Sequence, residues 1–181
     1  MGLSLGWLSK VLDTSKPGDN VLGAKSKGVN LGKSTKLSTA DYEVCVPLDW
    51  KVFKSNEETG VIILRSSDNT YNMVISPTYY DSTLEQVKIE ELFKRSLEVR
   101  INAERTSTKN DLVLSDQNVI VNKERIYVKY SGYEKVLLRI FTTFVIAEKG
   151  KLIFFYIESI GTNQEIFFNV CDLIVSSINV K

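Results

Sequence analysis

Histidine is absent from the 181-residue sequence. Ser-His-Asp and Cys-His nucleophilic centres, HExxH zinc sites and facial-triad iron sites all need an imidazole, so the sequence excludes them. Serine, lysine and carboxylate side chains are present, but the carboxylates fall on expected helix faces or in turns, and no spacing favours a reaction centre. We therefore predict that the protein is not an enzyme.

Cysteine is scarce. Cys45 lies in the apolar segment Tyr42–Val46, and Cys171 lies in the apolar segment Ile166–Ile178. Isolated thiols at such positions are usually small buried hydrophobic residues, not a disulfide or a metal pair. The nearest match to a phosphate-binding loop, Gly28–Ser34, has three residues between its glycines where the motif needs four. The sequence therefore predicts neither a metal nor a cofactor.

Leader and anchor signals are also lacking. Residues 1–12 have no basic stretch ahead of their apolar residues, and no lipid-acceptor cysteine follows them. Their apolar run is too short for a signal peptide and much too short to span a bilayer. We therefore expect a cytoplasmic protein.

The charge is nearly balanced, at +1 overall. Residues 1–40 carry six lysines and two aspartates, whereas residues 41–181 carry 17 basic and 20 acidic side chains. A mildly basic arm on a mildly acidic body is too weakly charged to bind nucleic acid.

The N-terminal part divides in two. Leu3, Trp7, Leu8 and Val11 recur at helical spacing and predict a short amphipathic helix over residues 1–13. Residues 14–40 are rich in glycine, serine and lysine and are typical of a flexible linker. The helix would dock on its own domain or on a symmetry partner, or it would serve as a partner-binding or weak membrane-surface anchor.

A folded domain is expected over residues 41–181. It begins with an antiparallel meander of four alternating or apolar segments: Tyr42–Val46, Trp50–Lys54, Val61–Arg65 and Tyr71–Ser76. Pro77–Asp81 is then expected to break the sheet. Within that break, Tyr79 and Tyr80 are either core residues or an exposed contact patch for a partner.

Two capping boxes predict two helices. Ser82–Glu85 introduces an amphipathic segment that runs to about Glu104, and Thr162–Glu165 introduces the apolar segment Ile166–Ile178. Between them, Ser131–Tyr133 suggests a turn or a bulge.

A long apolar hairpin is expected at the centre of the sheet. It is formed by Val136–Ala147 and Leu152–Ile157, joined by a turn at Glu148–Lys151. Because nearly every position is apolar, both faces of these strands must be covered. The fold class is therefore α+β, an α/β/α sandwich with a central antiparallel sheet and one helix on each face.

This order of elements resembles the PsbP/DcrB-like superfamily over about residues 41–180. The residues that carry the resemblance open the first strands and close the last helix: Pro47, Trp50, Ile174, Val175, Ser177 and Ile178. The resemblance implies a non-enzymatic protein, since members include extrinsic photosystem proteins, bacterial envelope proteins, a Ran-binding protein and chaperones of type VI secretion effectors. The chain differs from the exported members in lacking a signal peptide, and from the small chaperones in having residues 1–40.

We therefore expect a non-enzymatic protein-binding or accessory module, such as a chaperone or adaptor of a bacterial secretion or envelope system. A protein partner would bind at the sheet edge or through the N-terminal arm, with Leu3, Trp7, Leu8, Val11, Tyr79 and Tyr80 as candidate contacts. The alternative is a structural subunit of a phage or secretion assembly that docks through Leu3–Leu12. The sequence leaves the oligomeric state open.

Overall fold

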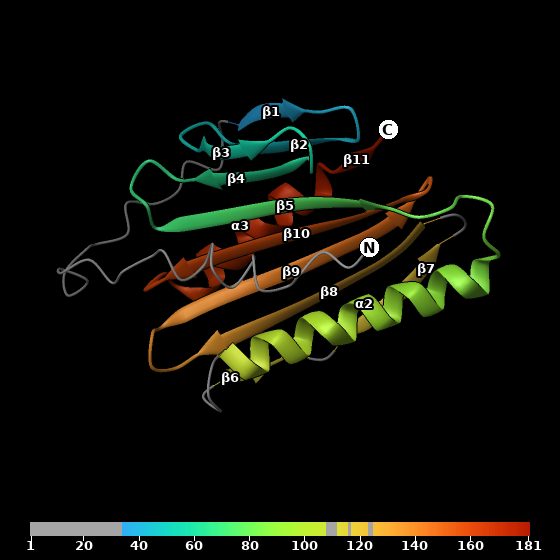
Figure 1. Ribbon diagram of the computed structural model, residues 1–181. Coiled ribbons are helices and arrows are strands. Elements are labelled where there is room, and N and C mark those ends of the chain that lie inside the picture. Colours follow the sequence, from blue (N-terminus) through green and yellow to red (C-terminus); the bar gives the residue numbers. More distant parts are fainter. Residues whose placement is uncertain (1–33, 108–111, 116, 123–124) are drawn as a thin grey trace.

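The computed structural model describes residues 34–107, 112–115, 117–122 and 125–181. In chain order the elements are β1 (Ser34–Ser38), β2 (Tyr42–Pro47), β3 (Lys51–Asn56), β4 (Val61–Arg65), β5 (Tyr71–Tyr79), α2 (Gln86–Ser107), β6 (Leu112–Leu114), β7 (Asn118–Asn122), β8 (Arg125–Glu134), β9 (Arg139–Glu148), β10 (Lys151–Ile160), α3 (Gln164–Ser176) and β11 (Asn179–Val180) (Figure 1). The predicted helix over residues 1–13 and most of the predicted linker lie outside the described residues.

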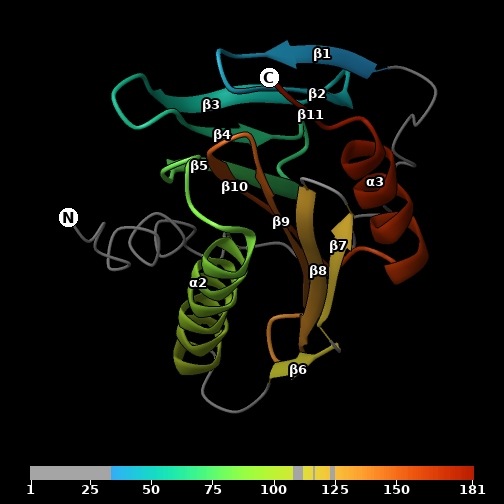
Figure 2. The same ribbon diagram turned by 90° about the vertical axis from the view of Figure 1, so that its right-hand side faces the viewer.

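An eight-stranded antiparallel sheet forms the centre of the domain. Its strand order is β3-β4-β5-β10-β9-β8-β6, and β7 pairs with β8 beside β6. Figure 2 shows α2 and α3 on opposite faces of this sheet. Each helix covers its own core: Phe93 and Leu97 of α2 pack on one face, and Phe167 and Ile174 of α3 pack on the other. The predicted fold class is confirmed.

The β9–β10 hairpin is buried on both faces, as expected from its composition. It closes through Lys149 and Gly150, whose φ angles of 51° and 75° suit a tight two-residue turn with the twist of the flanking strands. The expected start of β9 at Val136 is wrong. Residues 135–138 form an exposed turn instead, and Leu138 ends it with a φ of 50° that a strand residue does not adopt.

The predicted turn or bulge at Ser131–Tyr133 is also wrong. These residues continue β8 without interruption, and Gly132 is paired with Phe141 of β9. A Cβ atom on Gly132 would lie 2.3 Å from Cζ of Phe141. The glycine therefore makes room for a buried ring inside a regular strand, and no change in chain direction is involved.

Both helices begin later than their capping boxes suggest. Asn163, not Thr162, caps α3, since its Oδ1 accepts the backbone N–H group of Glu165 at 2.8 Å. The box at Ser82 does not form. Asp81 Oδ1 instead accepts the backbone N–H of Thr83 at 2.9 Å, which holds a turn ahead of the helix, and α2 begins only at Gln86.

The meander differs from expectation at its beginning. β2 pairs with β1 and β11 in a separate three-stranded sheet and not with β3. Ser34–Ser38, which the composition places in the linker, form β1. The pairing partner of a strand depends on contacts far away in the sequence, in this case the C-terminal strand β11.

Pro77 does not break the sheet as expected but lies within β5, opposite Ile153 of β10. The pairing between β4 and β5 ends at Ile75, so this edge of β5 has no described strand beside it at Pro77. A proline is tolerated there because its missing N–H group is not needed for a ladder bond.

The residues that carry the family resemblance meet where β2 passes the end of α3. Ser177 Oγ accepts the backbone N–H of Cys45 at 2.8 Å and donates to the carbonyl of Ile174 at 2.7 Å. Trp50, which closes a turn on the carbonyl of Pro47, packs against Tyr71, and Tyr71 stacks on Phe167 of α3. These residues connect β2, near the start of the domain sequence, to α3, near its end, so their role is structural.

Replacing Ser177 with alanine is expected to lower the free energy of unfolding by about 1–2 kcal/mol, because the part-buried N–H of Cys45 loses its acceptor. Urea unfolding measures the change. Ser176→Ala is the matched control, since Ser176 is exposed and its hydroxyl contacts only its own helix at the carbonyl of Leu173. Equal losses in the two variants would contradict the role given to Ser177.

Among the helices of the described residues, none combines the length and the apolar character that crossing a membrane requires.

Candidate functional site

The candidate contacts proposed from the sequence do not form one site. Leu3, Trp7, Leu8 and Val11 lie outside the described residues. Tyr79 ends β5, is 64% exposed and donates a hydrogen bond of 2.7 Å to Asp41. Tyr80 is half-buried and packs against the core under α2. A partner-binding role for any of these residues stays a prediction.

A different site lies on the α3 side of the sheet. The side chains of β8 alternate strictly between the two faces. Ile126, Val128 and Tyr130 are buried in the core on the α2 side. Tyr127 and Lys129 point to the α3 side and are only half-buried, because α3 covers the middle of the sheet and leaves this end partly open. The uncovered part forms an open groove between α3 and β8.

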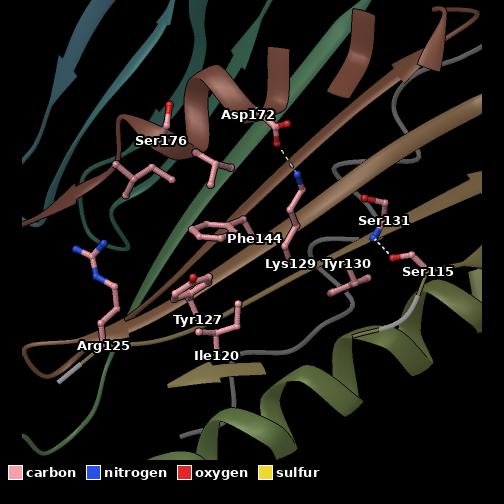
Figure 3. Close-up of a pocket in the computed structure, with 12 residues that line it drawn as sticks. Ser115, Ile120, Arg125, Tyr127, Lys129, Tyr130, Ser131, Phe144, Asp172 and Ser176 are labelled. Carbon is pink, nitrogen blue, oxygen red and sulfur yellow. Dashed lines mark hydrogen bonds and ion pairs between the residues drawn. The ribbon is translucent and has the colours of Figure 1, made fainter. Parts of the chain in front are cut away.

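The groove has a volume of about 890 Å³. Phe144 of β9 and Tyr127 form an aromatic floor, with ring centroids 5.7 Å apart. Ile120 of β7 extends this floor at one side, and Val175 of α3 lines the opposite wall. Figure 3 shows Ile120, Tyr127 and Phe144 in one row beneath α3. The floor is therefore apolar and partly accessible.

Charged side chains lie above this floor. Lys129 Nζ reaches across the groove to Asp172 Oδ1 of α3 at 2.5 Å (Figure 3). Arg125 lies at one end and forms an ion pair of 2.6 Å with Glu148 of β9. Among the lining residues that the structure describes, the ionisable acid and base side chains are two cations and one carboxylate. Both cations are therefore paired with a carboxylate, and one partly exposed ion pair crosses the groove.

The cysteine nearest to the groove is not a nucleophile. Cys171 is fully buried on the inner side of α3. Burial raises the pKa of its thiol to about 12, and the thiol therefore stays protonated at neutral pH. The prediction of small buried hydrophobic cysteines is confirmed for Cys171, whereas Cys45 is only half-buried.

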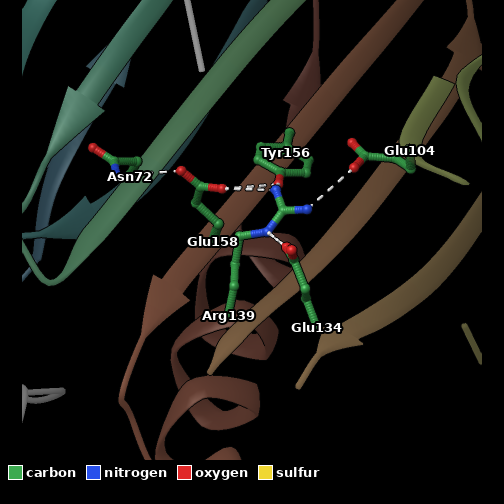
Figure 4. A network of polar contacts seen from close by, with 6 residues as sticks. All are labelled: Asn72, Glu104, Glu134, Arg139, Tyr156 and Glu158. Atoms are coloured by element: carbon green, nitrogen blue, oxygen red, sulfur yellow. Dashed lines mark hydrogen bonds and ion pairs between the residues drawn. The ribbon is translucent and has the colours of Figure 1, made fainter. Parts of the chain in front are cut away.

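A second polar cluster is buried between α2 and the sheet. Arg139 of β9 donates to Glu134 at 2.9 Å through Nε and to the Tyr156 hydroxyl at 2.9 Å through Nη1. It also forms ion pairs with Glu158 at 3.4 Å and with Glu104 of α2 at 3.6 Å (Figure 4). We refer to Glu104, Glu134, Arg139, Tyr156 and Glu158 as the Arg139 cluster.

The Arg139 cluster shows strong effects of burial. Burial raises the pKa of the Tyr156 hydroxyl, and the neighbouring carboxylate of Glu158 raises it further. Burial also raises the pKa of Glu104, while Arg139 and Arg100 partly oppose that shift. The carboxylates face a guanidinium and are buried, and the ion pair between Glu104 and Arg139 links α2 to the sheet.

No group of metal-ligating side chains suited to holding an ion is found in the part of the chain that the structure describes. The three glutamates of the Arg139 cluster surround a cation that the protein itself supplies.

Sequence reasoning missed the groove. Neither Tyr127 nor Lys129 was singled out as a candidate contact. One signal was available: Arg125, Tyr127, Lys129 and Ser131 alternate with more apolar residues and put polar or amphipathic side chains on one face of a strand.

Comparison with solved structures shows which fold this is. The chain is similar to the solution structure of cyanobacterial PsbP (CyanoP) from Synechocystis sp. PCC 6803, with a TM-score of 0.61 and 16% sequence identity over 85% of this chain and 96% of that chain. It is also similar to LpqN of Mycobacterium tuberculosis, described as involved in cell envelope biogenesis, with a TM-score of 0.48 and 12% identity over 82% of this chain and 91% of that chain. The chain has a PsbP-like fold, as the resemblance implied.

No family model matches the sequence, and no curated protein matches it. At 16% identity the likeness to cyanobacterial PsbP establishes the fold alone, and function must be argued from the residues of this chain.

Proposed function

We propose that the chain is a non-enzymatic accessory module that holds a segment of a protein partner in the groove between α3 and β8. The observation that carries the proposal is the aromatic floor, in which Tyr127 is partly exposed beside the accessible cation of Lys129. Accessible aromatic side chains next to polar groups are typical of binding surfaces, because they offer rigid contact area and a place to exclude water.

The chemistry of the groove favours one kind of occupant. An extended segment with an aliphatic or aromatic side chain would place that side chain on Tyr127 and Phe144. A carboxylate beside it would reach Lys129, which already binds the carboxylate of Asp172. We therefore propose an acidic segment with an apolar anchor. A chaperone or adaptor role in a secretion or envelope system is compatible with such binding, and a cytoplasmic location stays a prediction.

The ion pair across the groove does not prevent entry. Lys129 and Asp172 are 36% and 65% exposed at their side chains, and exposed pairs of this kind contribute only about 0–1 kcal/mol to stability. A ligand carboxylate can therefore replace Asp172 as the partner of Lys129 at little cost.

A charge reversal at Lys129 tests the proposal. Peptides are selected from a random displayed library against the full chain, and their affinities are measured by calorimetry. Lys129→Glu is expected to weaken acidic, apolar-anchored peptides about tenfold or more, because attraction becomes repulsion. Lys94→Glu, the same change on the exposed face of α2, is the matched control and should bind as the wild type does.

The variant Asp172→Asn distinguishes the effect of the Lys129 charge from the effect of the Lys129–Asp172 ion pair. It breaks the Lys129–Asp172 pair but keeps the cation, so acidic peptides should bind at least as tightly as to the wild type. If Lys129→Glu and Lys94→Glu bind the selected peptides equally well, the groove is not the binding site.

A further inference from the structure

We infer that β7 is a self-pairing edge, at which two copies of this chain join their sheets through antiparallel β7–β7 contact. The inference concerns the outer edge of β7, where Ile120 is the one described residue that also lines the groove, and it starts from the exposure of this strand. Val119, Ile120 and Val121 are three consecutive aliphatic residues that are 37%, 43% and 48% exposed.

β7 is an open edge. Within the described residues it pairs with β8 alone, in an uninterrupted register from Asn118 to Asn122. The opposite side of the strand therefore presents backbone N–H and C=O groups that another strand can use. Its five residues include no charge, no proline and no bulge, which are the usual features that keep an edge from pairing.

The other edge of the same sheet is protected. β3 is exposed along its full length, but it carries Lys51 and Lys54, and its register shifts between Val52 and Lys54. Charged side chains and a bulge discourage the addition of a strand. Because the two edges belong to one sheet, the difference between them points to β7 as the edge that pairs.

The sequence of β7 identifies the partner as a second copy. Asn-Val-Ile-Val-Asn reads the same in both directions around Ile120. Antiparallel pairing centred on Ile120 therefore sets Ile120 against Ile120 and Val119 against Val121 of the other copy. Pairs of β-branched side chains are favourable cross-strand contacts, and an interface of this kind is closed by twofold symmetry.

Each face of the sheet would remain continuous in the dimer. Ile120 is opposite Tyr127 and lies on the face of the groove. Val119 and Val121 are opposite Val128 and Ile126, whose side chains belong to the core on the α2 side. Pairing thus covers exposed apolar area on both faces, and the valines can be changed without touching the groove.

Sedimentation equilibrium of the full chain over a range of concentrations tests the inference. The wild type is expected to reach a dimer, and Val121→Lys should weaken dimerisation about tenfold, because the two substituted chains together disturb both symmetric Val119–Val121 pairs of the dimer. Val52→Lys on β3 is the matched control, with the same substitution at a site that is 50% exposed, and it should dimerise as the wild type does. A wild type that stays monomeric at every concentration, or equal effects of the two variants, overturns the inference.

Single cysteines test the register. Under mild oxidation Ile120→Cys should cross-link to itself, whereas Val119→Cys and Val121→Cys should cross-link efficiently only when mixed with each other. The wild type, with its half-buried Cys45 and buried Cys171, is the control for background cross-linking. Efficient self-cross-linking of Val119→Cys would contradict pairing centred on Ile120. Val121→Lys should leave peptide binding in the groove unchanged, so this test and that of the proposed function fail independently.

Discussion

Replacing Arg139 with methionine is expected to lower the free energy of unfolding by about 3–5 kcal/mol at neutral pH. The side chain of Arg139 is only 11% exposed, and its guanidinium serves Glu104, Glu134 and Glu158 at once. Without it, three carboxylates share a poorly solvated space. Urea unfolding of the variant and the wild type measures the loss.

The pH dependence gives this prediction a second, independent readout. Protonation removes the repulsion among the carboxylates. The loss of unfolding free energy in Arg139→Met should therefore be smaller at about pH 5 than at about pH 8. A loss that does not depend on pH would show that packing and not charge explains the effect.

Glu104→Gln is the counterpart on the acid side of the cluster. The pKa of Glu104 is raised above its ordinary value of 4.5 in the folded protein, so the folded state holds this proton more tightly than the unfolded state does. The contribution of Glu104 to stability therefore falls as the pH rises from 4.5 through the raised pKa. Glutamine does not titrate, so the variant should lack this pH-dependent fall in the free energy of unfolding. Near neutral pH it should be as stable as the wild type or more stable.

Replacing Gly132 with alanine is expected to lower the free energy of unfolding by about 2–3 kcal/mol. The backbone of Gly132 is not in the left-handed region, so the cost arises from contact alone. The new Cβ would lie 2.3 Å and 2.5 Å from two atoms of the Phe141 ring, which is fully buried.

A double-mutant cycle with Phe141→Leu isolates that contact. Leucine lacks the ring atoms nearest to Gly132, so Gly132→Ala should cost less in the Phe141→Leu background than in the wild type. Urea unfolding of the four proteins supplies the comparison. Additive losses would contradict the account of Gly132 as the space for this ring.

Much of the fold could be predicted from local pattern. Because the β9 and β10 segments are apolar at nearly every position, they required cover on both faces of the sheet. The two predicted helices, one ending near Glu104 and one ending near Ile178, provide that cover. Two of the errors share a physical cause. Pro77 and Gly132 read as breaks in the sequence, but both lie in strands because of what stands beside them in the sheet.

The candidate site was less predictable. The groove exists because α3 leaves one end of the sheet partly uncovered. How much of a sheet a helix covers depends on packing, and neither the sequence pattern of the helix nor that of the strands determines it. The symmetric sequence of β7 was visible, but its exposure at an edge depends on its pairing with β8 and on the absence of another described strand beside it.

The groove between α3 and β8 is the centre of the functional account, and amide chemical shifts of the full chain test it most directly. An acidic, apolar-anchored peptide selected from the library is titrated into labelled protein. We expect the largest shift changes at Tyr127, Lys129 and Asp172, with little change along the exposed face of α2 around Lys94. Changes that cluster on α2 or around Tyr79, with the groove residues unaffected, would contradict the account.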